Sequence, residues 1–232
     1  MQIEIWSDIA CPWCYIGRRR FETALAQFEH RDQVEIIWRS FQLDPNAPRE
    51  FNGSIYEMLA KKYNMSREKS EAMHAHVTEL AAQEGLEYNF DIAHPVNSFD
   101  AHRLLHFALH HGVQSEMKER IQRGYFTEGV VVSDHDTLVR LAVDVGLDAE
   151  ETRAMLASDQ YAAEVRADIQ RARMFGIQGV PFFAVDEKYG VSGAQPAEVF
   201  KQTLERAWAD AHPLIQVVGA DGNVCDDENC TV

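Results

Sequence analysis

Two cysteines lie where an apolar run, residues 3–9, meets the first amphipathic stretch, in the sequence Cys11-Pro12-Trp13-Cys14. This position predicts a strand-to-helix junction, where unpaired N–H groups and the positive end of the helix dipole stabilise a thiolate. Pro12 suits a first helical position, which makes Cys11 the N-cap and turns Cys14 toward the helix interior. We therefore expect an exposed Cys11 and thiol–disulfide exchange by the pair.

The same cysteine spacing is also typical of half a zinc site, and it occurs by chance. Zinc needs two further ligands at close spacing, and no second Cys-x-x-Cys or Cys-x-x-His lies nearby. A strand before the pair and a helix after it form the setting of a thioredoxin-like redox motif. This context favours redox chemistry over a metal at the pair.

A proline near the C-terminal strands is the second candidate element. Proline cannot donate to a β-ladder, so Pro181 at the start of a strong strand indicates an edge, a kink or a cis bond. A cis bond would leave the backbone of Val180 free to pair with an extended substrate. Because cis bonds are uncommon, an ordinary turn proline is the favoured interpretation of these residues alone. Phe182, Trp13 and Tyr15 are expected as apolar substrate contacts, and Pro12, Val180 and Pro181 as further substrate-binding residues.

A second cysteine pair, Cys225 and Cys230, flanks an acidic run in the C-terminal tail. The intervening residues allow the two sulfurs to meet, although acidic neighbours disfavour a thiolate at either one. Three interpretations remain open: a redox pair that exchanges with the first, a structural disulfide of the tail, and a metal clamp with the acidic side chains.

Polar residues outside the cysteine pairs have more than one interpretation. His102, His106 and His110 follow helical spacing, which can support zinc. No His-Glu-x-x-His sequence accompanies them and their neighbours are apolar, so we expect them to line a groove or cover a helix. Asp8 either shapes the site, accepts a proton through water, or simply ends a strand.

The composition limits the function classes. With 232 residues, 46% of them hydrophobic, the chain can form one large domain or one domain with an insertion. A formal net charge of −15 argues against nucleic-acid partners. The N-terminal residues enter a strand without a leader pattern, and no apolar run approaches the roughly 20 residues that cross a bilayer. These features predict a cytoplasmic protein, where a cysteine pair is more often catalytic than structural.

Hydrophobic periodicity predicts βαβ, then a helical block, then ββα. The expected segments are strands at 3–8 and 34–43 around a helix at 16–30, helices over 54–173, strands at 180–186 and 189–192, and a helix at 196–211. The strand-bearing ends are too small to fold alone, so the pattern predicts an α/β fold in which one mixed sheet carries an inserted helical block.

Four motifs give the chain a family resemblance over residues 1–211. They are Asp8-Ile9-Ala10-Cys11-Pro12-Trp13-Cys14-Tyr15-Ile16-Gly17, Asn97-Ser98-Phe99-Asp100-Ala101-His102-Arg103-Leu104, Tyr125-Phe126-Thr127-Glu128-Gly129, and Gly179-Val180-Pro181-Phe182-Phe183 with Ser192-Gly193-Ala194-Gln195. The chain resembles the FrnE-like branch of the DsbA-family oxidoreductases. The resemblance implies a thioredoxin-like domain at 1–48 and 176–212, a helical insertion at 49–175, and a tail at 213–232.

The resemblance also implies site roles: Cys11 attacks, Cys14 resolves, and Val180 with Pro181 forms a cis-proline loop that faces them. It replaces the turn interpretation of the proline. The tail pair resembles one that works with the first pair in some FrnE-like proteins. At the position of Trp13, the exported DsbA proteins look to have His, which would stabilise the neighbouring thiolate further. The resemblance therefore does not imply a strongly oxidising reduction potential for this cysteine pair.

The expected activity is that of a protein disulfide oxidoreductase or isomerase acting on protein or peptide thiols and disulfides, with no cofactor and with glutathione as a candidate redox partner. The recycling partner and the direction of electron flow are not indicated. One alternative is a glutathione-dependent transferase or isomerase, since kappa-class transferases and hydroxychromene-carboxylate isomerases are similar in fold. Another alternative is a redox-responsive chaperone or binding module.

Overall fold

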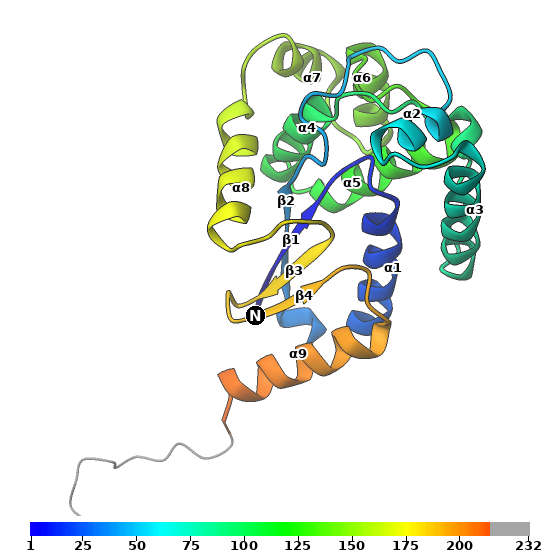
Figure 1. The fold of residues 1–232 in the computed structure, drawn as a ribbon. Helices are drawn as coiled ribbons and strands as arrows, with labels where there is room; N and C mark the ends of the chain where they lie inside the picture. Colours follow the sequence, from blue (N-terminus) through cyan, green and yellow to red (C-terminus); the bar gives the residue numbers. More distant parts are fainter. Residues whose placement is uncertain (214–232) are drawn as a thin grey trace, which may run out of the picture.

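The computed structural model describes residues 1–213, in which a four-stranded mixed sheet has the order β2-β1-β3-β4 (Figure 1). The strands are β1 (Gln2–Ser7), β2 (Glu35–Ser40), β3 (Phe182–Val185) and β4 (Tyr189–Ser192). β1 pairs in parallel with β2, whereas β3 is antiparallel to both β1 and β4. The predicted α/β mixed sheet, joined from the two ends of the chain, is confirmed.

One face of the sheet is covered by α1 (Pro12–Ala26) and α9 (Ala197–Ala211), which pack against each other (Figure 1). The apolar residues of both helices and of all four strands form one core there. Its fully buried members include Ile3, Ile5, Phe21, Phe183, Phe200 and Leu204.

The opposite face and the β2 edge are covered by α8 (Ala162–Met174). Trp6 of β1 is fully buried on this face and donates through Nε1 to the Asp168 carbonyl at 3.0 Å. The Asp168 carboxylate accepts from the backbone N–H of Ser40 at 2.8 Å, so a side chain satisfies a ladder group of the edge strand. The helix thereby closes an edge that would otherwise be open to pairing.

The segment between β2 and β3 is helical, as the sequence predicts, and lies above the sheet in Figure 1. Its remaining helices are α2 (Ile55–Lys62), α3 (Arg67–Gln83), α4 (Phe99–His110), α5 (Gln114–Arg123), α6 (His135–Asp144) and α7 (Ala149–Leu156). They share a large core with the first turns of α1. Short 3-10 turns, η1 (Arg31–Gln33) and η2 (Phe90–Ile92), and a π-helical turn, η3 (Gly124–Glu128), complete the described elements.

Helix α5 attaches this helical segment directly to the sheet. The Gln114 side chain accepts from the Trp38 N–H and donates to the Trp38 carbonyl, both at 3.1 Å, in the manner of a neighbouring strand. On α1, Arg19 and Tyr15 each donate at 2.5 Å to the Glu119 carboxylate. The start of α1 is therefore held between the sheet and α5.

Some predicted boundaries are wrong by a few residues. α1 begins at Pro12, as the cysteine motif predicts, but earlier than the apolar periodicity at 16–30 indicates; it ends at Ala26 rather than near residue 30, and β2 ends at Ser40 rather than near residue 43. β3 is an inner strand, so the edge interpretation of Pro181 is also wrong. In residues 1–213, none of the helices is long and apolar enough to cross a membrane.

Candidate active site

The start of α1 presents the first cysteine pair as the sequence predicts. Cys11 is the extended N-cap residue, with φ −92° and ψ 110°, and Pro12 occupies the first turn. The Cys14 N–H donates to the Cys11 carbonyl at 3.1 Å, which closes that turn. Within the described part of the chain both cysteines are free thiols.

Both sulfurs are buried, which was expected only of Cys14. Cys11 is only 3% exposed and Cys14 only 1%, so the expectation of an exposed Cys11 is wrong. The physical reason is the inserted helical segment, whose side chains enclose a cavity above the helix start. The Cys11 side chain lines this cavity, whereas Cys14 does not. Of the two sulfurs, Cys11 is therefore the one that a molecule in the cavity can reach.

The proline loop lies directly against Cys11. The Val180–Pro181 peptide bond is cis, as the family resemblance implies, and the turn interpretation is wrong. The Cys11 thiol donates to the Val180 carbonyl at 3.6 Å. On the other side of the loop, Gly17 of α1 allows close contact, because a β-carbon there would lie 2.9 Å from Pro181 Cγ.

The two sulfurs affect each other's pKa in opposite directions. Hydrogen bonding with Cys14, burial and the charge of Cys14 raise the pKa of Cys11 well above its usual value. Burial alone raises the pKa of Cys14, but the hydrogen bond from Cys11 and the nearby Lys118 ammonium lower it overall.

Asp8 is a buried carboxylate held by four donors next to the pair. Its oxygens accept from the N–H groups of Ile9 and Leu43 at 2.7 Å, from Ser98 Oγ at 2.9 Å, and from His102 Nε2 at 3.2 Å. Burial raises the pKa of Asp8, but these hydrogen bonds and the His102 interaction lower it overall. The carboxylate therefore stays charged, and its charge contributes to the raised pKa of Cys11.

Lys118 places a second buried charge behind the pair. This α5 residue is 1% exposed, and its Nζ lies 5.7 Å from the centre of the Trp38 ring. Burial lowers the pKa of Lys118 to about 8, although the neighbouring Cys14 and Asp8 charges oppose the shift. An ammonium this close favours the charged form of Cys14, the sulfur that faces away from the cavity.

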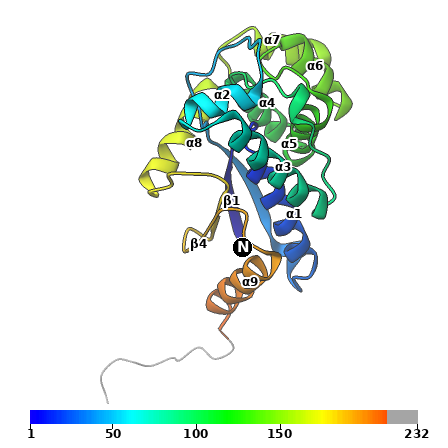
Figure 2. The same cartoon turned by 45° about the vertical axis from the view of Figure 1, so that its right-hand side comes forward.

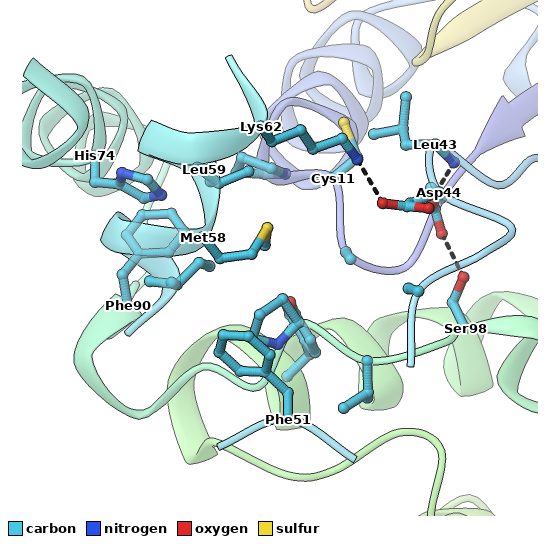
Figure 3. A pocket seen from close by; sticks show the side chains of 18 of the residues that line it. Cys11, Leu43, Asp44, Phe51, Met58, Leu59, Lys62, His74, Phe90 and Ser98 are labelled. Atoms are coloured by element: carbon cyan, nitrogen blue, oxygen red, sulfur yellow. Dashed lines mark hydrogen bonds and ion pairs between the residues drawn. The ribbon is translucent and has the colours of Figure 1, made fainter. Parts of the chain in front are cut away.

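The cavity above Cys11 has a volume of about 450 Å³ and is lined mainly by apolar side chains (Figure 3). Residues from α2, α3 and the segments before α2 and α4 form its walls; they include Phe51, Ile55, Met58, Leu59, Val77 and Val96. Tyr125, from the π-helical turn, is a buried member of the lining, and Trp13 is a solvent-exposed one. In Figure 2, α2 lies above the N-terminal end of α1 and α3 runs beside α1.

The other predicted contacts are only partly brought together. Pro12 and Trp13 line the cavity, but Phe182 and Tyr15 do not. The Tyr15 hydroxyl instead binds Glu119, and the Phe182 ring packs over Gly190 on the sheet. Cys225 and Cys230 lie outside the described residues, as does the tail pair's expected contact with the first pair.

The histidines of α4 bind separate partners. His102 Nε2 meets Asp8, whereas His106 Nε2 lies 3.0 Å from an Asp168 oxygen and 3.2 Å from Ser40 Oγ. His110 lies beside the Tyr161 ring. In residues 1–213, no three His, Cys, Asp or Glu side chains are arranged to hold a metal ion.

Comparison with known proteins gives the family. Residues 2–205 match the family model of the DSBA-like thioredoxin domain. The chain belongs to this family. A crystal structure of a probable DsbA oxidoreductase from Streptomyces coelicolor is similar over 100% of this chain and 99% of its own, at 48% identity and a TM-score of 0.88. The chain is thus a DsbA-like, thioredoxin-fold oxidoreductase.

Two more distant relatives extend the comparison. The uncharacterized protein YwbO of Bacillus subtilis (strain 168) is 27% identical over 206 residues, which cover 88% of this chain and 96% of that protein. The cytosolic disulfide reductase DsbM from Pseudomonas aeruginosa is 15% identical with a TM-score of 0.62, over 90% of this chain and 98% of its own. The second likeness is one of fold.

The sequence analysis missed Lys118 and assigned no partner to His102. Lys118 follows Met117 and lies three residues before Ile121, so it falls on the apolar, buried face of α5. A lysine on the buried face of a helix indicates a candidate site residue, because lysine is rarely buried without a specific role. Gly17 was part of the family motif, but its contact with Pro181 depends on the tertiary structure.

Proposed function

We propose that this DsbA-family protein is a protein thiol–disulfide oxidoreductase or isomerase of the FrnE-like branch, using Cys11 and Cys14 as its redox pair. One observation carries the proposal: the Cys11 side chain lies between the cavity and the Val180 carbonyl, 3.6 Å from its oxygen, while Cys14 lies behind it. A substrate sulfur in the cavity can thus meet Cys11 first. The cis-proline loop offers backbone groups of Val180 to the substrate segment.

In the reductive direction, the Cys11 thiol loses its proton and the resulting thiolate attacks one sulfur of a substrate disulfide. The substrate S–S bond breaks, the leaving thiolate takes up that proton, and a Cys11–substrate disulfide forms. Cys14 then releases its proton toward the substrate sulfur that is to leave, the Lys118 ammonium stabilises the Cys14 thiolate, and this thiolate attacks the Cys11 sulfur. A Cys11–Cys14 disulfide forms and the second substrate thiolate leaves, so two electrons pass from protein to substrate. The oxidative direction is the reverse.

Several finer assignments belong to the same proposal. Cys225 and Cys230 relay electrons between Cys11–Cys14 and a recycling thiol or disulfide. The thioredoxin-like part consists of residues 1–48 and 176–212, the insertion of 49–175, and the tail of 213–232. Action in the cytoplasm is supported by the shared fold with a cytosolic disulfide reductase.

Trapping of the covalent intermediate tests the redox pair. A Cys14→Ser variant should accumulate a mixed disulfide between Cys11 and a peptide substrate, which mass spectrometry of a proteolytic digest locates. A Cys11→Ser variant should form none and should lose insulin reduction. Full insulin reduction by Cys11→Ser would refute the proposal. Suppression of client aggregation that survives in this variant would favour the chaperone alternative.

A glutathione-dependent activity is the second candidate. Its support is the shared fold with a 2-hydroxychromene-2-carboxylate isomerase, at 13% identity and a TM-score of 0.69, and with a DsbM structure determined with GSH. Isothermal titration with glutathione separates the candidates. Tight binding combined with full activity in Cys14→Ser would replace the dithiol mechanism with the glutathione-dependent one.

A further inference from the structure

We infer that Tyr88 is a positioning residue for the redox pair: its hydroxyl binds the Pro12 carbonyl, between the two cysteines, and so keeps the N–H groups of the first turn of α1 directed toward the Cys11 sulfur. The inference rests on the proposed function, in which Cys11 attacks as a thiolate. Four features support it: the contact itself, the fixed position of the Tyr88 ring, the uncapped start of α1, and the place of the acceptor within the cysteine motif.

The contact joins the inserted helical segment to the cysteine motif. Tyr88 lies between α3 and η2, is only 7% exposed, and donates through its hydroxyl to the Pro12 carbonyl at 2.7 Å. Burial, followed by the charges of Cys11 and Cys14, raises the pKa of Tyr88. The phenol therefore keeps its proton and remains a hydrogen-bond donor beside the pair.

The Tyr88 ring is fixed by its surroundings. It stacks on the Phe126 ring, with the two centroids 4.5 Å apart. The backbone on both sides of Tyr88 is bound to the π-helical turn, because the Asn89 N–H donates to the Phe126 carbonyl at 2.7 Å and Thr127 Oγ1 donates to the Glu87 carbonyl at 2.6 Å. A donor that is already fixed loses little conformational freedom on binding, so it can hold its acceptor in one position.

The start of α1 lacks the usual cap, because its N-cap residue is a cysteine. Ser, Thr, Asp or Asn at this position would accept from an N–H group of the first turn and stabilise the helix start. The Cys11 thiol instead donates to the Val180 carbonyl and, within residues 1–213, makes no capping hydrogen bond. The bond from Tyr88 to Pro12 supplies, from outside the helix, a restraint on the first turn that the cap residue does not provide.

Restraint of this turn favours ionisation of Cys11. Hydrogen bonding with the Cys14 sulfur, burial and the charge of Cys14 raise the pKa of Cys11, and the Cys14 backbone N–H opposes them. Such N–H groups stabilise a thiolate only while the turn keeps them directed toward the sulfur. The Pro12 carbonyl also shares a peptide group with the Trp13 N–H, so a donor on the carbonyl polarises that N–H further. Both effects have the same sign, and loss of the Tyr88 hydroxyl should disfavour the Cys11 thiolate.

A pH profile of Cys11 alkylation tests the inference on the full-length, pre-reduced Cys14→Ser protein, with and without Tyr88→Phe. Labelling by iodoacetamide is followed by mass spectrometry of the peptide that contains Cys11, so that the tail thiols do not contribute. Below the midpoint of the profile, Tyr88→Phe should slow labelling about two- to fivefold, the loss expected for one hydrogen bond. Above the midpoint the two rates should converge, because Tyr88 does not line the cavity and access to the thiolate is unchanged.

Two further variants, each in the same Cys14→Ser protein, complete the test. Tyr56→Phe is the matched control: it removes a hydroxyl of the inserted segment that donates to Asp91 Oδ1 at 2.9 Å rather than to the motif, and it should keep the profile. Thr127→Val replaces Tyr88→Phe if that variant does not fold. It removes the bond to the Glu87 carbonyl that restrains the Tyr88 backbone, and should move the midpoint to higher pH by a smaller amount.

The outcomes are separable. Identical profiles with and without Tyr88→Phe, or an unchanged midpoint in Thr127→Val where Tyr88→Phe does not fold, would overturn the inference. A rate that falls by one constant factor at every pH would also overturn it, because the hydroxyl would then affect only access to Cys11. The same loss in Tyr56→Phe would do so as well, since removal of any nearby hydroxyl would suffice. Undiminished insulin reduction by Cys11→Ser would instead overturn the proposed function.

Discussion

Gly17 of α1 and Pro181 of the cis-proline loop are packed so closely that a β-carbon at position 17 would lie 2.9 Å from Pro181 Cγ. The same atom would lie 3.3 Å from the Ala194 β-carbon. The glycine thus fixes how closely the loop approaches the helix that carries both cysteines. The distance between Cys11 and Val180 depends on this contact.

Gly17→Ala should therefore lower both stability and activity. Alanine favours a helix, but overpacking against the proline ring costs about 1–3 kcal/mol and displaces the loop. Urea unfolding measures the first effect, and the rate of disulfide exchange measures the second. Gly179→Ala is the matched control for stability, since a β-carbon there meets nothing within 4 Å. A Gly17→Ala protein as stable as the wild type would show that the loop adjusts without cost.

Lys118→Met should raise the pKa of Cys14, because the ammonium that stabilises its thiolate is removed. Resolution of the Cys11–substrate disulfide should slow several-fold at pH 7, so that intermediate should accumulate in rapid-quench samples. The pKa of Lys118 is lowered to about 8, so its charge is lost as the pH rises through that value. The rates of wild type and variant should then converge above about pH 9.

Lys69→Met, at an exposed position of α3, provides the control for loss of a lysine. It should resolve the intermediate at the wild-type rate. If the Lys118→Met and wild-type rates differ by a constant factor at every pH, the Lys118 ammonium does not stabilise the Cys14 thiolate. A purely structural defect would persist when Lys118 loses its proton, whereas loss of a charge effect would not.

Asp8→Asn should lower the pKa of Cys11, because the carboxylate charge opposes a thiolate there. The effect is measured in a Cys14→Ser background, in which the Cys14 thiol no longer affects the pKa of Cys11. Alkylation of Cys11 by iodoacetamide at pH 7 should be faster in Asp8→Asn/Cys14→Ser than in Cys14→Ser alone. Stability should fall by about 1–3 kcal/mol, since the new amide group cannot accept from every donor that Asp8 binds. Asp100→Asn removes another buried carboxylate and should leave the alkylation rate unchanged. Slower alkylation in Asp8→Asn would contradict the assigned direction of this effect.

His102 should make the fold sensitive to mild acid. Burial lowers its pKa from the usual 6.5, so the folded protein keeps the imidazole neutral while the unfolded chain binds a proton. Stability is therefore complete above about pH 6.5 and should decline by up to about 1.4 kcal/mol per pH unit as the pH falls below it. His102→Asn keeps a donor for Asp8 but does not titrate, so its unfolding free energy should change less between pH 7 and pH 5.

His76→Asn, at an exposed histidine of α3, serves as the comparison. It should retain the wild-type pH dependence of urea unfolding. An acid-dependent loss of stability that is the same in His102→Asn as in the wild type would assign the effect to other groups.

The architecture and the chemical centre could be predicted because they depend on local patterns. Alternating and helical apolar periods mark the elements, and the Cys11–Cys14 spacing at a helix start marks the redox pair. The family motifs extend this to the cis bond before Pro181. These features each lie within a few neighbouring residues.

The environment of the sulfurs could not be predicted in the same way. Asp8 and His102 are 94 positions apart, and no local pattern pairs them. The burial of Cys11 depends on how the inserted segment lies over α1. The local sequence predicts only that Cys11 is at the start of a helix, a position that is usually exposed. The charge of Lys118 becomes relevant to Cys14 only once α5 packs against α1.

The attachment of α5 has a consequence for how the enzyme admits a bulky client. Paired hydrogen bonds from Gln114 to the β2 backbone, and ion pairs from Glu119 to α1, make relative rotation of the insertion and the sheet costly. By contrast, the contact of α2 with the rest of the cavity rim, between Lys62 and Asp44, is partly open to solvent. We expect hydrogen–deuterium exchange to be faster in α2 than in α5, so that α2, rather than the whole insertion, adjusts to a bulky client.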